Sequence, residues 1–182
     1  MNTKTSIRSF QGSRRRAAGW LLLAITIWVF ASVPLAQAQT QGAAKPAMPA
    51  LFLENTSPKP LVPTTEAFRD AVKAAGWSIL GVTNMAGILS ERGFTLHPVL
   101  VFDACSGKYS SDLLSRDETR FVASMIPCRV AIYQTSTGKV VISRMNSVAM
   151  AGMVGGPAGE VIKKSGEEME RIIQATLKKL GS

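Results

Sequence analysis

Two long stretches of the chain carry apolar side chains at helical spacing. The first covers residues 64–76, where Thr64 is a candidate N-cap residue and Gly76 a candidate stop. Its predicted buried face consists of Phe68, Ala71, Val72 and Ala75. The second covers residues 158–180, and its predicted buried face consists of Val161, Met169, Ile172, Ile173, Leu177 and Leu180. Both stretches are therefore predicted to be amphipathic helices that cover a core.

Between these two helices, the pattern predicts strands and shorter helices. The clearest feature is a hairpin over residues 128–145, in which two β-rich runs flank a Thr-Ser-Thr-Gly turn. Extended runs are predicted over residues 77–84 and 94–104, and helices over residues 85–93 and 108–125. Helices interspersed with a hairpin-containing sheet predict an α+β fold. We expect a two-layer α/β sandwich with a small mixed or antiparallel sheet, a C-terminal hairpin, and helices on one face.

The first 38 residues have the pattern of an export signal. A basic segment ending in Arg14–Arg16 precedes 17 residues without a charge, and the small-x-small triplet Ala36-Gln37-Ala38 follows. This order predicts a signal peptide over residues 1–38, cleavage after Ala38, and a periplasmic protein. A retained membrane anchor is the alternative, because 17 apolar residues are near the lower limit for crossing a bilayer.

The chain after the predicted signal peptide has a proline-rich start. Residues 39–63 hold five of the nine prolines and predict a tether, although the segment ALFLE within them is a candidate edge strand. Residues 64–182 then predict a single domain.

The charge of the chain falls once the signal is set aside. Five of the 21 Lys and Arg side chains lie in the signal, which leaves 16 basic and 12 acidic side chains. They form no cluster interleaved with aromatic residues, so no nucleic-acid partner is expected.

Five segments of the chain together resemble one protein family. The segments FRDAVKAAGWSIL, VLVFDAC, DLL, IPCRVAIY and GKVVI occur in the order and rough spacing of the domain-of-unknown-function family 302. The resemblance covers most of residues 64–180. It implies a compact α/β domain that pairs as a homodimer, with a cysteine pair as in exported members, and it implies no activity. Two loops are expected to differ in shape, because Ser106-Gly107 replaces a common Asn-Pro and Ser147 replaces a proline after Asn146.

Cys105 and Cys128 are the two cysteines, and both lie at predicted strand ends. In an oxidising compartment, an even cysteine count favours a structural disulfide. It would close a loop of about 24 residues and contribute about 3 kcal/mol. A thiol-redox pair is the first alternative. The thiol pKa of Cys105 would be lowered by a helix N-terminus and by Lys108 nearby. Arg129 would act in the same direction on Cys128. The C-x-x-C spacing of dithiol oxidoreductases is absent from the sequence.

A soft-metal site is the second alternative. Thiolates and thioethers select copper(I) over harder ions. The candidate ligands are Cys105, Cys128, Met125, Met150 and Met153, the last two on one helical face. Methionine stripes also occur as core filling, so the pattern alone does not decide between the two roles.

His97 is the only histidine in the chain, and Pro98 follows it. An extended strand would separate His97 from Cys105 by about 26 Å, so the two are not expected to share a metal. The sequence lacks the C-x-x-C-H motif that attaches a c-type haem. A b-type haem held by His97 and a methionine remains an open alternative. No acid/base pair or G-x-S-x-G motif indicates an enzyme.

These observations predict a non-enzymatic binding or accessory protein of the cell envelope. Its partner would be an unknown small ligand or an envelope protein. The ligand pocket is expected near the strand ends that carry Cys105 and Cys128. Its predicted lining residues are Met125, Arg129, Tyr133 and Asp103. The alternative is a periplasmic copper or thiol-redox protein that uses the same two cysteines.

Overall fold

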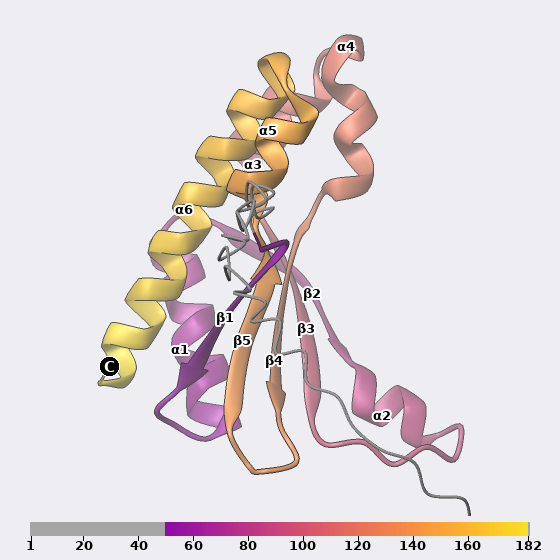
Figure 1. Cartoon of the computed structure of the whole chain (residues 1–182), viewed down its shortest axis with the longest axis vertical. Coiled ribbons are helices and arrows are strands. Elements are labelled where there is room, and N and C mark those ends of the chain that lie inside the picture. The colour runs from indigo at the N-terminus through magenta and orange to yellow at the C-terminus, as the bar shows by residue number, and fades with distance from the viewer. Residues whose placement is uncertain (1–49, 182) are drawn as a thin grey trace, which may run out of the picture. The chain divides into compact units, whose positions relative to one another are not determined.

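The computed structural model describes residues 50–181, which form a five-stranded sheet and the helices packed around it (Figure 1). The strands are β1 Phe52–Ser57, β2 Ser78–Asn84, β3 Val99–Cys105, β4 Cys128–Gln134 and β5 Val140–Met145. The helices are α1 Leu61–Ala74, α2 Met85–Ser90, α3 Gly107–Leu114, α4 Asp117–Arg120, the 3-10 helix η1 Phe121–Met125, α5 Ser147–Val154 and α6 Gly156–Leu180. None of the helices described is long and apolar enough to cross a membrane. The predicted signal peptide lies outside the described residues.

The sheet has the strand order β1-β5-β4-β3-β2, and every neighbouring pair is antiparallel. The predicted hairpin over residues 128–145 forms its centre, with Ile132 opposite Ile142. Gly138 in the turn has a φ of 82°, a left-handed conformation that favours glycine. The predicted α+β fold is therefore confirmed, and all strand pairs of its sheet are antiparallel.

One face of the sheet packs against α1 and α6, which lie together on that side in Figure 1. Side chains alternate along a strand, so β4 presents Val130 and Ile132 to these helices, and β3 presents Phe102. All three are fully buried. The helices contribute the predicted apolar faces, and the buried members are Phe68, Ala71, Val72, Met169, Ile172, Ile173, Leu177 and Leu180. The two layers of the predicted sandwich meet in this core.

The segment before α1 differs from its prediction as a tether. Residues 52–57 form β1, which pairs with β5 at the edge of the sheet, so the edge-strand alternative is correct here. The helix α1 begins at Leu61 rather than Thr64, and Pro60 occupies the N-cap position. Thr64 instead lies in the first turn, where its buried hydroxyl donates to the Pro60 carbonyl at 2.8 Å. The folded domain therefore includes residues that a boundary at 64 would leave out.

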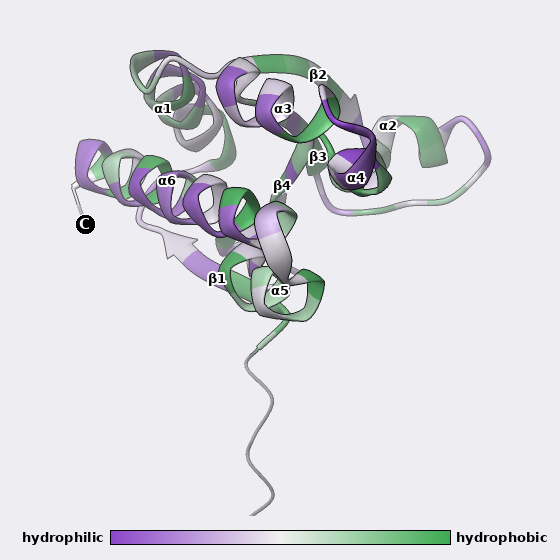
Figure 2. Cartoon of the chain, turned by 90° about the horizontal axis from the view of Figure 1, so that it is seen from above, coloured by the Kyte–Doolittle hydropathy of each residue, from purple (hydrophilic) through white to green (hydrophobic). Residues whose placement is uncertain are grey.

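Two helical segments also differ from the predicted pattern. The single helix expected over residues 108–125 is broken into α3, α4 and η1, because Arg116 is extended at a φ of −120° and a ψ of 134°. The helix α5 was not among the predicted elements. Figure 2 shows almost no hydrophilic colour on α5, whereas α1 and α6 carry both colours. A segment that is apolar all round lacks the amphipathic period that identifies a surface helix.

Candidate functional site

A cavity of about 380 Å³ lies where β4 begins and β5 ends. Its walls come from η1, the start of β4, the end of β5, α5 and α6. We call it the Cys128 cavity. Five of the twelve side chains that line it contain sulfur: Met125, Cys128, Met145, Met150 and Met169. The volume lies in the range of about 300–1,000 Å³ that is usual for small-ligand sites.

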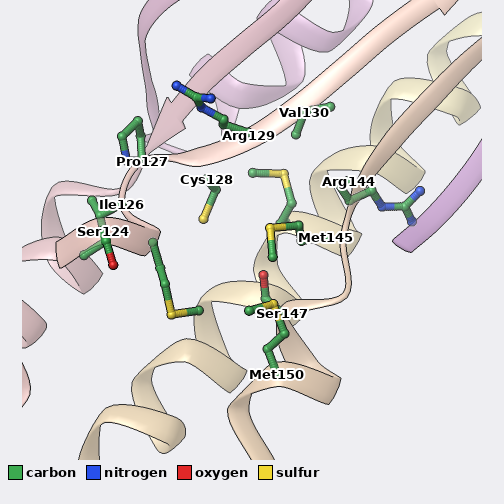
Figure 3. Close-up of a pocket in the computed structure, with 12 residues that line it drawn as sticks. Ser124, Ile126, Pro127, Cys128, Arg129, Val130, Arg144, Met145, Ser147 and Met150 are labelled. Atoms are coloured by element: carbon green, nitrogen blue, oxygen red, sulfur yellow. The ribbon is translucent and has the colours of Figure 1, made fainter. Parts of the chain in front are cut away.

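The antiparallel sheet explains why these residues meet. The first residues of β4 and the last residues of β5 lie at the same end of the sheet, with Val130 opposite Arg144. Met145 is the last residue of β5, beyond that final pair with β4. Figure 3 shows the side chains of Cys128, Met145 and Met150 converging on the space between the strands and α5.

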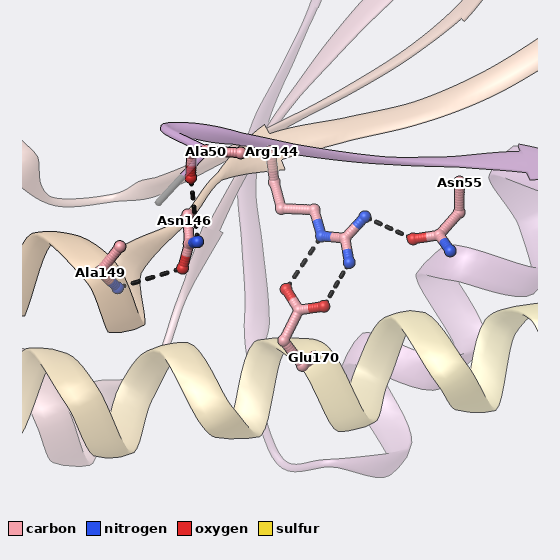
Figure 4. A network of polar contacts seen from close by, with 6 residues as sticks. All are labelled: Ala50, Asn55, Arg144, Asn146, Ala149 and Glu170. Atoms are coloured by element: carbon pink, nitrogen blue, oxygen red, sulfur yellow. Dashed lines mark hydrogen bonds and ion pairs between the residues drawn. The ribbon is translucent and has the colours of Figure 1, made fainter. Parts of the chain in front are cut away.

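Asn146 fixes the turn that brings α5 over the cavity (Figure 4). Its side-chain oxygen accepts a hydrogen bond from the Ala149 amide at 3.1 Å, which caps α5. Its side-chain nitrogen donates to the Ala50 carbonyl at 2.9 Å, which ties the cap to the chain entering β1. Ser147 is the first residue of α5, a position that also tolerates the proline of relatives. The substitution at Ser147 therefore does not prevent helix formation.

Arg144 anchors the same end of β5 through a buried ion pair. Its guanidinium, 5% exposed, binds both carboxylate oxygens of Glu170 on α6 and also donates to the Asn55 side chain on β1. Figures 3 and 4 show this guanidinium pointing away from the cavity and toward α6 and β1. The interaction joins β1, β5 and α6, so it holds two walls of the cavity in place.

The helix α5 lies very close to α6, and two glycines of α6 permit the contact. A Cβ atom at Gly159 would lie 2.6 Å from the Ala151 carbonyl oxygen. A Cβ atom at Gly166 would lie 2.9 Å from the Ser147 Cβ atom. Any larger residue at either position would push α5 outward, and Ser147 and Met150 would move with it. The depth of the cavity therefore depends on these glycines.

Cys105 and Cys128 are near each other but are not bonded, since both are free thiols in the structure. Cys128 pairs with Ala104, so Cys105 is its diagonal neighbour at the end of β3. Both cysteines border a second cavity of about 20 Å³, and only Cys128 reaches the larger one. The two free thiols therefore share the lining of the smaller cavity, and a disulfide between them stays a prediction.

The redox alternative predicts lowered thiol pKa values, and the surroundings of Cys128 act in the opposite direction. Cys105 does precede a helix, and its sulfur lies 3.1 Å from the Ser110 hydroxyl oxygen. Burial raises the pKa of the Cys128 thiol, a hydrogen bond with Ser165 partly offsets the rise, and a negative charge on Cys105 would add to it. A raised pKa keeps Cys128 protonated near neutral pH, which disfavours its action as a nucleophile. The expected lowering by Arg129 is therefore wrong.

Arg129 does not lower that pKa because it lies on the other face of the sheet. Its side chain is 73% exposed, and its Nε lies 3.3 Å from a carboxylate oxygen of Asp103. Figure 3 shows the guanidinium pointing away from the cavity, although the residue contributes to the lining. Tyr133 shares this outward direction and donates a 2.9 Å hydrogen bond to Glu54. Of the predicted pocket, only Met125 and Arg129 line the cavity, whereas Asp103 and Tyr133 do not.

The remaining predicted residues fall outside the cavity. Met153 is 64% exposed on α5 and does not line it, although Met150 from the same helix does. His97 is exposed and precedes β3, while the cavity lies near the other end of that strand, so His97 and the cavity methionines do not form a haem site. Met145 belongs to the methionine-rich segment considered for a soft metal, whereas sequence reasoning missed Met169 as a cavity residue. The spacing of residues does not reveal that a strand end and a distant helix meet.

Comparison with known proteins identifies the fold and the family. A search of curated proteins found no match. The chain is similar to a solved structure described as an uncharacterized conserved protein DUF302 from Bacillus stearothermophilus, at 18% identity and a TM-score of 0.64. The similarity covers 70% of this chain and 99% of that one. Residues 53–176 also match the family described as "Domain of unknown function DUF302". The chain therefore belongs to the DUF302 family.

Proposed function

We propose that this protein is a non-enzymatic binding protein of the cell envelope that holds a small ligand in the Cys128 cavity. The observation that carries the proposal is the cavity itself, which combines a ligand-sized volume with walls from five separate elements. Its lining includes neither a carboxylate nor an imidazole. The two arginines of the lining direct their charges elsewhere, to Asp103 and Glu170. These features favour binding over acid/base catalysis.

The location and the assembly are parts of the same proposal. The envelope location rests on the export signal predicted in residues 1–38, and the homodimer rests on the family resemblance. The native mass of the protein, purified from the periplasm without reductant, tests the location, the assembly and the state of the two cysteines. Cleavage after Ala38 sets the chain mass, and a dimer doubles it. A Cys105–Cys128 disulfide would make each chain lighter by the two thiol hydrogens.

Native mass spectrometry with two matched variants tests the binding site. Met150→Trp places a large side chain in the cavity, and Met153→Trp makes the same change one turn later on α5, at an exposed position. We expect a small bound species on the wild-type protein and on Met153→Trp, and its loss from Met150→Trp. A bound species that persists in Met150→Trp would place the ligand elsewhere and contradict the proposal.

A further inference from the structure

The sulfur atoms of the Cys128 cavity come from separate parts of the chain. Six methionines lie among the described residues, and four of them line this one cavity together with Cys128. The four come from η1, β5, α5 and α6, so no single helical stripe explains their meeting. Only Met169 is fully part of the main core, at 4% exposure, and Met145 is 44% exposed. Met125 packs against a second buried cluster, so core filling accounts for Met125 and Met169 but not for Met145 and Met150.

We propose that the Cys128 cavity binds a soft monovalent metal ion, copper(I), through the sulfur atoms of Cys128, Met145 and Met150. This inference rests on the proposed function, since it names the ligand class of the same cavity. Figure 3 shows these three side chains converging from the start of β4, the end of β5 and α5. The thioethers of Met125 and Met169 complete the sulfur-rich wall around them.

The chemistry of the lining selects for a soft ion. Thiolate and thioether sulfur prefer copper(I), whereas carboxylates, carbonyls and water suit magnesium, calcium and manganese. No group of three or more His, Cys, Asp or Glu residues suited to a metal occurs between residues 50 and 181. A zinc ion would therefore lack its usual set of four nitrogen, sulfur or oxygen ligands.

The charges around the cavity also suit a monovalent cation. Binding replaces the thiol proton of Cys128 with the metal, and the released proton goes to solvent. A thiolate and copper(I) together carry no net charge, which limits the cost of placing the ion in a partly buried site. Arg129 and Arg144 would otherwise repel a cation. Their guanidiniums point away from the cavity and bind Asp103 and Glu170 instead.

Competition with a chromogenic copper(I) chelator, without oxygen, tests the proposal on the full exported protein. We expect one copper(I) ion per chain and no retention of zinc at the same concentration. Cys128→Ser, Met145→Leu and Met150→Leu should each weaken copper(I) binding at least tenfold. Leucine matches the volume of methionine, so thermal melting should show folded proteins. Met153→Leu and Cys105→Ser are the matched controls and should bind as the wild type does.

The outcomes separate this inference from the proposed function. Equal copper(I) affinity in Met145→Leu, Met150→Leu and the wild type would overturn the sulfur site. Failure of the wild type to compete with the chelator would overturn it as well. If an organic species is nevertheless lost from Met150→Trp but kept by Met153→Trp, the cavity is a binding site for another ligand. In that case the proposed function survives and the metal inference does not.

Discussion

Replacing Glu170 by alanine should destabilise the protein far more than breaking an exposed ion pair. The Arg144 guanidinium is 5% exposed and binds both Glu170 carboxylate oxygens. In Glu170→Ala the buried charge keeps only its hydrogen bond to Asn55. Leaving one partner of a buried pair uncompensated costs about 3–5 kcal/mol. We expect about 3 kcal/mol, the low end of that range, because Glu170 is 30% exposed and water can reach the space it leaves.

Equilibrium unfolding in urea measures this loss. Trp77 is 5% exposed and reports unfolding by its fluorescence. With a slope of about 1.5 kcal/mol per molar urea, a loss of 3 kcal/mol lowers the midpoint by about 2 M. Arg144→Met should cost less than Glu170→Ala, because the carboxylate that remains is partly hydrated. The double variant Arg144→Met/Glu170→Leu should recover stability relative to Glu170→Ala, since no charge stays buried.

Asp70 supplies the control. Its ion pair with Lys179 joins α1 to α6, but the two side chains are 63% and 56% exposed. Exposed pairs of this kind contribute little to stability. Asp70→Ala should therefore leave the urea midpoint unchanged within error. The reasoning is refuted if Glu170→Ala shifts the midpoint no further than Asp70→Ala does.

Two further predictions follow from close contacts in the structure. Gly166→Ala should lower the melting temperature, because its Cβ would lie 2.9 Å from an atom of α5, whereas Gly152→Ala on α5 meets nothing within 4 Å and should be neutral or stabilising. Equal melting temperatures for the two variants would contradict the close packing of α5 on α6. The hydrogen bond and charge of Glu54 raise the pKa of Tyr133 above its ordinary value of 10.0. Glu54→Gln should therefore lower the Tyr133 pKa in an absorbance titration at alkaline pH, while the raised pKa of Tyr109 stays in place. The stabilising contribution of this bond is complete below the unfolded-state tyrosine pKa and is lost as the pH rises through the folded-state pKa. Two tyrosine transitions that do not change in Glu54→Gln would contradict the assignment.

The local sequence pattern was sufficient to predict the helices and strands that have an amphipathic period. The buried faces of α1 and α6 and the strands of the central hairpin agree with their periodicity, because burial against one neighbour layer repeats along each element. Alternation of side chains along β4 also follows from the sequence. It directs Cys128 and Val130 to one face and Arg129 and Tyr133 to the other.

The Cys128 cavity is formed by contacts between distant residues, which no local sequence pattern predicts. Met125 and Cys128 are close in sequence, and their meeting was predicted, but Met145 and Met169 approach them through the antiparallel pairing and through α6. Met150 reaches the cavity, and Met153 on the same helix does not, because α5 lies against Gly159 and Gly166.

The chain alone therefore determined its helices, its central strands and the kind of side chains available for binding. Only the tertiary structure decided which of those side chains share a cavity. The physical reason is that secondary structure follows the repeat of burial along a few turns or residues. A site at strand ends depends instead on register, helix packing and side-chain direction, which join residues far apart in the sequence. The two cysteines illustrate this difference, since their strand ends were predicted, but only the packing of β4, β5 and α5 makes Cys128, and not Cys105, line the larger cavity.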